Sequence, residues 1–179
     1  MVIYSFYIFD RHTECIYSKS WIPPSEMPQP PPSTAPPPPP GTSHNDPKTT
    51  ALPDRTRSSQ KHPRSAQTKA SDDAKLIFGT VFSLRNMVRK LGGDDDAFIS
   101  YRTAQYKLHY YETASCLRYV MLTDTTAPSM RNVLHQIYIN LWVEYVVKNP
   151  LSPVEHKGGV GVRNELFELG LDQFVRGLN

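Results

Sequence analysis

The order of hydrophobic and polar residues predicts a β-hairpin at the start of the chain. Residues 2–9, VIYSFYIF, are dense in β-branched and aromatic side chains, which favours a strand. A period of two assigns the apolar residues to two faces, Val2, Tyr4, Phe6 and Ile8 on one and Ile3, Tyr7 and Phe9 on the other. Because both faces are apolar, we expect a central strand that is covered on both sides. A polar turn at residues 10–13 and an alternating segment at residues 15–21 complete the predicted hairpin.

Three later segments show a helical period of hydrophobic residues. The first carries one stripe with steps of four and three positions, formed by Ile77, Val81, Leu84, Val88 and Leu91. Ser71, with two aspartates after it, is the predicted N-cap of this helix. Gly92 and Gly93, directly after Leu91, predict its end. Residues 129–148 are predicted to form a second long helix, and residues 160–178 are typical of a weaker final helix.

Two or three strands are predicted between the first two helices. Residues 97–103 form the first, residues 104–113 form the second or continue the first, and residues 116–123 form the last. The predicted order of elements is therefore β-β-α-β-β-β-α-α. A five-stranded antiparallel sheet with helices on both faces is the simplest arrangement that buries the apolar stripes. We therefore predict an α+β fold.

Composition marks residues 23–71 as an insert within a single domain of residues 1–179. Fourteen of the 17 prolines lie between Pro23 and Pro63. Proline donates no backbone hydrogen bond, and the rest of this segment has almost nothing apolar to bury, so we expect the insert to be disordered. The five prolines at residues 36–40 fit either a ligand of an SH3 or WW domain or an inert loop. Without residues 23–70, 131 residues remain, which is enough for one hydrophobic core.

Charge and hydropathy exclude several classes of function. Residues 23–70 carry six basic and three acidic side chains, and the remainder carries 14 of each. Because nucleic-acid-binding domains concentrate positive charge on their folded surface, we expect no nucleic-acid partner. The apolar first segment is too short to span a bilayer, so we expect membrane contact only through partner proteins. Two cysteines, Cys15 and Cys116, fit free thiols better than a disulfide framework.

No group of residues has the spacing of a catalytic or metal site. Three consecutive aspartates at residues 94–96 do not converge on one cation, which favours a solvated loop. His109 and His135 have no Cys, Asp or Glu at the spacing of a zinc site or a catalytic triad. No glycine-rich loop ends in the GK[ST] of a phosphate-binding motif. We therefore predict a non-enzymatic protein with no catalytic residues, no metal and no cofactor.

The long helix is predicted to be apolar on more than one side. One stripe consists of Met130, Leu134, Ile137, Leu141 and Tyr145, and a second set consists of Val133, Tyr138, Ile139, Trp142, Val143, Val146 and Val147. Such a helix is buried on more than one face. We therefore predict that Tyr138, Trp142 and Val146 contact another protein chain. The alternative is that the final helix covers them.

Several segments, taken in order, resemble one protein family. They are YSFYIFDR at residues 4–11, FSLRNMV at 82–88, YKLHYYET at 106–113, MLTD at 121–124 and VEYVVKNPLSP at 143–153. Together they resemble the smallest longin-like subunit of the TRAPP (transport protein particle) complex. The segment at residues 165–178, ELFELGLDQFVRGL, is similar to the final helix of that family. The resemblance covers the chain except for the insert.

This resemblance implies a longin-like (profilin-like) fold and a non-catalytic subunit of a tethering complex. That complex acts as guanine-nucleotide exchange factor for a Rab GTPase in transport from the endoplasmic reticulum to the Golgi. The implied partners are a second longin-like subunit, core α/β subunits and the Rab GTPase. The implied location is the cytoplasm, peripheral on endoplasmic-reticulum and cis-Golgi membranes. Two alternatives share the fold: a small subunit of a coat or adaptor complex, and a longin-type SNARE, which needs a coiled coil and an anchor after Asn179.

Two parts of the matching segments are candidates for partner contact. On the first helix, the polar residues off the apolar stripe are predicted to contact the Rab or the longin partner; they are Arg85, Asn86, Arg89 and Lys90. Within YKLHYYET, the period of two separates a core-facing set, Tyr106, Leu108 and Tyr110, from a set that faces water or a partner, Lys107, His109 and Tyr111. We therefore interpret YKLHYYET as a structural strand with one contact face.

Overall fold

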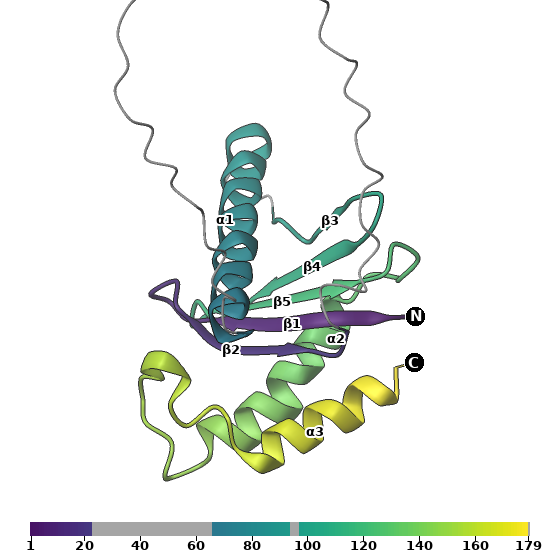
Figure 1. Cartoon of the computed structure of the whole chain (residues 1–179). Coiled ribbons are helices and arrows are strands. Elements are labelled where there is room, and N and C mark those ends of the chain that lie inside the picture. Colours follow the sequence, from purple (N-terminus) through teal and green to yellow (C-terminus); the bar gives the residue numbers. More distant parts are fainter. Residues whose placement is uncertain (23–65, 94–96, 179) are drawn as a thin grey trace, which may run out of the picture.

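A computed structural model describes residues 1–22, 66–93 and 97–178 of the chain (Figure 1). Its elements are β1 (Ile3–Phe9), β2 (Cys15–Ser20), α1 (Ala66–Gly92), β3 (Ser100–Arg102), β4 (Lys107–Glu112), β5 (Arg118–Thr123), α2 (Arg131–Gln136), η1 (Ile137–Val147), a short 3₁₀ helix η2 (Lys157–Gly159) and α3 (Glu165–Arg176). The strands form one antiparallel sheet in the order β2-β1-β5-β4-β3. The prediction of an α+β fold with a five-stranded antiparallel sheet is confirmed.

The helices cover the two faces of the sheet unequally. Figure 1 shows α1 alone on one face, with α2, η1 and α3 on the other. Two separate core clusters correspond to these faces. Strand β1 lies between β2 and β5, and all seven of its residues are buried. This agrees with the prediction of a central strand with two apolar faces.

The predicted assignment of side chains to the two faces of β1 is wrong at the start of the strand, for Ile3 and Tyr4. Ile3 packs with Phe6 and Ile8 toward α2, η1 and α3, whereas Tyr4 packs toward α1. The pairing of β1 with β5 shifts register between Ile3 and Ser5, as in a β-bulge. A bulge inserts one extra residue into the alternation, so side chains before it change faces.

The second helix is one continuous helix whose hydrogen-bonding pattern changes along its length. It begins as α2 and continues as η1, which has π-helical turns; at its end the N–H of Lys148 donates to the carbonyl of Val143. Because π-turns join residues five apart, the two predicted apolar sets merge into one buried face. That face consists of Leu134, Ile137, Leu141, Trp142 and Val146.

Trp142 and Val146 are buried inside this chain, at 2% and 1% exposure. The indole of Trp142 packs edge-on against Tyr119 of the sheet and Phe167 of α3. The prediction that another chain covers Trp142 and Val146 is therefore wrong, because α3 supplies large side chains that close over them. Tyr138 is half-buried and contacts the Tyr119 ring.

The face under α1 holds the second core. Ala74 and Val81 are buried there, and Ile77, Leu84 and Val88 of the predicted stripe are half-buried. Leu91, the last residue of that stripe, is 83% exposed. The helix begins at Ala66, five residues before the predicted N-cap, so residues 66–71 are helical and the predicted end of the insert is wrong. Residues 23–65 and 94–96, including the proline run and the three aspartates, lie outside the described residues.

The segment YKLHYYET forms β4, and only one of its two faces matches the prediction. Leu108 and Tyr110 pack under α1, as expected. His109 is 1% exposed on the opposite face, because α2 covers it, so the expectation that it faces water or a partner is wrong. Its Nε2 lies 2.9 Å from Oγ1 of Thr123, and its Nδ1 accepts from the N–H of Met130 at 3.4 Å. In the described part of the chain, no helix has the length and apolar composition needed to cross a membrane.

Candidate functional site

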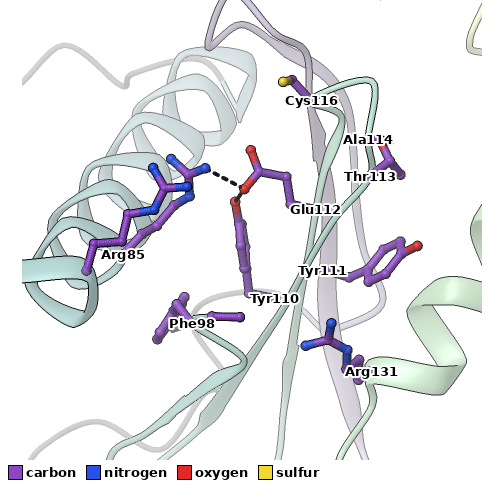
Figure 2. A pocket seen from close by; sticks show the side chains of 11 residues that line it. Arg85, Phe98, Tyr110, Tyr111, Glu112, Thr113, Ala114, Cys116 and Arg131 are labelled. Atoms are coloured by element: carbon purple, nitrogen blue, oxygen red, sulfur yellow. Dashed lines mark hydrogen bonds and ion pairs between the residues drawn. The ribbon is translucent and has the colours of Figure 1, made fainter. Parts of the chain in front are cut away.

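A pocket of about 420 Å³ lies between the C-terminal half of α1 and the hairpin of β4 and β5 (Figure 2). It is lined by Arg85 and Arg89 of α1, by Ala97 and Phe98 before β3, by Tyr110, Tyr111 and Glu112 of β4, by Thr113, Ala114 and Cys116 of the hairpin turn and by Arg131 of α2. We call it the arginine pocket after Arg85, Arg89 and Arg131. Tyr110 belongs to the face of the sheet under α1, and Tyr111 packs against the core on the other face. The pocket therefore wraps around the edge of β4.

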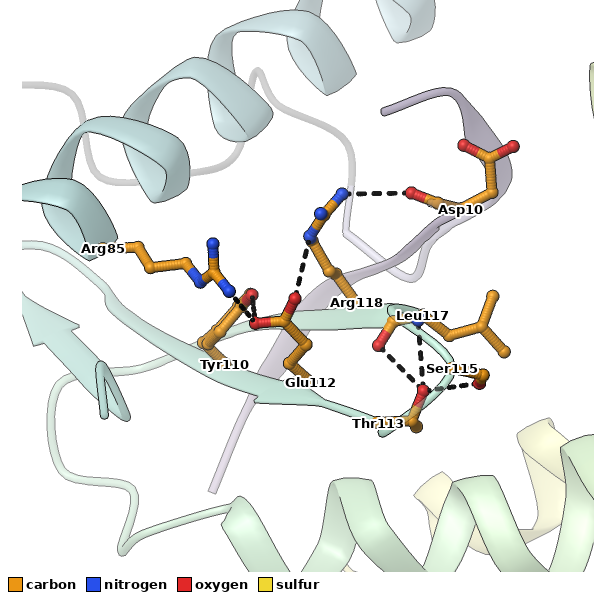
Figure 3. Close-up of polar contacts among 8 residues, drawn as sticks. All are labelled: Asp10, Arg85, Tyr110, Glu112, Thr113, Ser115, Leu117 and Arg118. Carbon is orange, nitrogen blue, oxygen red and sulfur yellow. Dashed lines mark hydrogen bonds and ion pairs between the residues drawn. The ribbon is translucent and has the colours of Figure 1, made fainter. Parts of the chain in front are cut away.

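Local structure fixes the walls of this pocket. Arg85 and Arg89 are four residues apart on α1, so they lie on the same side of the helix. The hairpin turn is held by Thr113, whose Oγ1 accepts from the N–H of Leu117 at 3.1 Å and lies 2.9 Å from Oγ of Ser115 (Figure 3). Cys116 in this turn has a positive φ of 61°, which is uncommon for a residue other than glycine.

Glu112 is the centre of a polar network on one wall of the pocket (Figure 3). Its carboxylate pairs with Arg85 at 2.9 Å and with Arg118 at 3.4 Å, and it accepts a hydrogen bond from the Tyr110 hydroxyl at 2.9 Å. Arg118 also donates to the carbonyl of Asp10 at 3.1 Å. Burial raises the pKa of Tyr110, and the neighbouring Glu112 carboxylate raises that pKa further, so the phenol stays a hydrogen-bond donor.

Among the described residues that line the pocket, positive charge is in excess. Its lining includes three guanidinium groups and one carboxylate, and that carboxylate already contacts three partners. Arg89 and Arg131 are exposed, and within the described residues neither forms an ion pair. Their side chains therefore remain able to bind an anionic group.

The structure brings together only part of the predicted contact set. Arg85 and Arg89 line the pocket, whereas the half-buried Asn86 and the exposed Lys90 do not. Sequence reasoning missed Glu112, Arg118 and Arg131. A signal existed for two of them, since the predicted hairpin at residues 104–123 places Glu112 opposite Arg118. Arg131 had no such signal, because only the packing of α2 against the sheet brings it to the pocket.

Among the residues that the structure describes, the other ionisable groups do not form a reactive constellation. Burial, together with the nearby Lys107 ammonium, lowers the pKa of His109 to about 4, so the imidazole is neutral near pH 7. Burial raises the pKa of the Cys15 thiol to about 11, which keeps it protonated. Among the described residues, no three His, Cys, Asp or Glu side chains are grouped so that they could hold a metal ion. The geometry supports recognition of an anionic group.

Comparison with known proteins gives consistent matches over the whole chain. The profile of a family described as Sybindin-like matches residues 3–178. Transport protein particle subunit bet5 of Schizosaccharomyces pombe is 39% identical over 183 aligned residues, which cover 100% of this chain and 99% of that protein. Trafficking protein particle complex subunit 1 of Homo sapiens is 33% identical, covering 99% of this chain and 94% of that protein. Trafficking protein particle complex subunit BET5 of Saccharomyces cerevisiae is 33% identical, with coverages of 87% and 78%. The resemblance seen in the sequence is thereby confirmed.

Proposed function

Because this chain belongs to the Sybindin-like family, we propose that it is a non-catalytic subunit of a trafficking protein particle. The observation that carries this proposal is the match to a named particle subunit over 100% of this chain and 99% of that protein. An alignment of this extent includes both helical layers and the sheet. The partners are other subunits of the particle, one of them a second longin-like subunit.

The particle acts as guanine-nucleotide exchange factor for a Rab GTPase on membranes between the endoplasmic reticulum and the Golgi. Exchange requires that the particle bind nucleotide-free Rab more tightly than nucleotide-bound Rab, and it needs no covalent chemistry. This chain supplies part of the rigid surface on which the Rab docks. The α1 side of the sheet carries the contacts, through Arg85, Asn86, Arg89 and Lys90, and the half-buried Tyr138 contributes on the opposite side.

Affinity purification of the chain from its own cell extract, followed by mass spectrometry, tests the proposal. We expect a second longin-like subunit and the core subunits of the particle in near-equal amounts. The purified particle is expected to accelerate nucleotide release from a Rab GTPase. Recovery of coat or adaptor subunits instead would establish the alternative, and recovery of the chain alone would contradict both.

A charge-reversal variant tests the contact surface. Arg89→Glu combined with Lys90→Glu changes two exposed side chains on α1 without touching the Glu112 network. We expect slower nucleotide release from the Rab, or loss of the longin partner, with unchanged thermal stability of the isolated chain. Normal assembly together with normal release would exclude this part of α1 from the interface.

A further inference from the structure

Within the described residues, the arginine pocket combines two features: positive charge that forms no ion pair, and a sheet edge that has no neighbouring strand. The charge is that of Arg89 and Arg131, which reach the pocket from opposite faces of the sheet. Arg89 belongs to α1, on one face, and Arg131 begins α2, on the other. Figure 2 shows the Arg131 side chain on the α2 side of β4 and the Arg85 side chain on the α1 side.

The open edge is the last part of β4. Strand β3 pairs only with residues Lys107, Leu108 and His109 of β4. Beyond them, the N–H of Tyr110 donates to the carbonyl of Ile99 at 2.9 Å. By the period of two, the N–H and C=O of Glu112 point to the same side as those of Tyr110, away from β5. Within the described residues, no loop backbone group forms a hydrogen bond with the N–H or C=O of Glu112 on this side. In this part of the structure β4 therefore has a short free edge inside the pocket.

We propose that the arginine pocket binds an extended acidic segment of a partner protein, which adds to the free edge of β4 as a short strand. The backbone of the segment bonds to Glu112, in the mode by which extended peptides add to exposed sheet edges. Successive side chains of a strand point to opposite faces. One acidic side chain therefore reaches Arg89 on the α1 face, and the next in sequence reaches Arg131 on the α2 face. The pocket selects two adjacent acidic residues.

This inference rests on the proposed function, because a subunit of a complex requires binding segments on its partners. The chemistry favours a protein segment over a phosphate group for two reasons. The pocket volume of about 420 Å³ exceeds that of one phosphate, and its walls include the rings of Phe98, Tyr110 and Tyr111. Aromatic side chains at a sheet edge pack well against the side chains of an added strand.

Two fluorescent peptides of identical composition test the geometry. One has the order Thr-Val-Glu-Glu-Val-Thr, with adjacent glutamates, and the other has the order Thr-Glu-Val-Glu-Val-Thr, which places both glutamates on one face. Binding to the full chain is measured by fluorescence anisotropy. We expect the adjacent-glutamate peptide to bind at least about tenfold more tightly, a difference of about 1.4 kcal/mol. Equal affinity of the two peptides would overturn the proposal.

Matched variants separate the pocket from general electrostatics. Arg89→Gln with Arg131→Gln removes two charges from the pocket, and Arg163→Gln with Arg176→Gln removes two exposed charges elsewhere. We expect the first pair to weaken binding of the adjacent-glutamate peptide about tenfold, and the second pair to change it less than about twofold. Equal weakening by both pairs would show diffuse attraction and overturn the site.

Hydrogen exchange tests the added strand. Saturating adjacent-glutamate peptide is expected to slow exchange of the Glu112 amide, and unchanged exchange would rule out strand addition. Inorganic phosphate displaces the peptide only weakly if the proposal holds, and displacement as effective as that by unlabelled peptide would identify a phosphate site instead. Failure here while the chain still co-purifies with particle subunits would leave the proposed function intact. Peptide binding by a chain that purifies alone would support the peptide site and contradict the proposed function.

Discussion

The two faces of the sheet are covered in different ways. Under α2, η1 and α3, five aromatic rings form a closed circuit of neighbours with ring centroids 5.2–6.3 Å apart: Phe6, Tyr17, Phe167, Trp142 and Tyr119. Under α1, a single helix covers the sheet, and several large apolar residues of that helix remain exposed, namely Leu76, Phe82, Met87 and Leu91. One face is sealed by the continuous α2–η1 helix together with α3, and the other is only partly covered by α1.

This difference separates stability from recognition. A closed aromatic core depends on each side chain, because close-packed interiors tolerate little change of volume. The partly covered face keeps its polar network and the arginine pocket at its margin, where side chains meet solvent. We therefore expect substitutions on the sealed face to lower stability, and substitutions on the α1 face to affect binding first.

The largest expected effect is on the sealed face, at Trp142. Trp142→Ala removes an indole that is 2% exposed and packs edge-on against Tyr119 and Phe167. We expect a loss of about 3–5 kcal/mol in the free energy of unfolding, measured by urea denaturation, since the cavity cannot fully collapse. Leu76→Ala on α1 is the comparison, because Leu76 is 70% exposed. It should cost less than about 0.5 kcal/mol. Similar losses for both would refute the contrast between the faces.

A smaller effect is expected at a glycine beside β2. Gly159 has a φ of +80°, and a Cβ built there would collide with the carbonyl of Ile16. Gly159→Ala should therefore destabilise by about 2–3 kcal/mol in the same denaturation experiment.

The matched substitution is Gly79→Ala, in the middle of α1. Nothing lies within 4 Å of a Cβ at Gly79, and alanine favours helix more than glycine does. The variant should be more stable than the parent chain by about 0.5–1 kcal/mol. Destabilisation at Gly79 would mean that α1 is packed more closely than its exposed side chains indicate.

The third effect depends on pH, again on the sealed face. His109 is buried with its pKa lowered to about 4, whereas an unfolded histidine has a pKa of about 6.5. Between these values the unfolded chain binds more protons than the folded chain. The stability that depends on a neutral His109 is therefore fully present above about pH 6.5 and is lost as pH falls toward 4. The parent chain should lose about 1–2 kcal/mol more than His109→Gln between pH 7 and pH 5. Identical pH profiles in urea denaturation would show that another group controls acid stability.

Hydrophobic periodicity was enough to predict a five-stranded antiparallel sheet with helices on both faces. It failed where the local geometry departs from a regular period. The bulge in β1 exchanged the faces of Ile3 and Tyr4, and the π-turns of η1 merged two apolar sets into one face. For that reason Trp142 looked available to a partner when α3 in fact covers it. A polar residue can also mislead, as at His109, where Thr123 and the backbone of Met130 satisfy a buried imidazole.

The candidate site was predictable only in part. Arg85 and Arg89 could be selected because they lie off the apolar stripe of a helix, which is a local property of the sequence. Glu112 gave a weaker signal, through its position opposite Arg118 in a hairpin. Arg131 lies 42 positions after Arg89 in the sequence and reaches the pocket through tertiary packing alone. The hydrophobic period of a single segment does not indicate which distant residue will pack beside it.

The smallest predicted effect concerns the ion pair of Arg85 and Glu112, at the margin of the α1 face. Its side chains are 24% and 19% exposed, and Tyr110 and Arg118 hold the Glu112 carboxylate in place. A double-mutant cycle of Arg85→Ala and Glu112→Ala should give a coupling energy of about 0.5–1 kcal/mol. The comparison pair is Glu144 of η1 and Lys148 at its C-cap. Their side chains are 48% and 61% exposed, and they should couple by less than about 0.5 kcal/mol. If the two pairs couple equally, partial burial does not strengthen the Glu112 network, and its role in shaping the pocket would have to come from geometry alone.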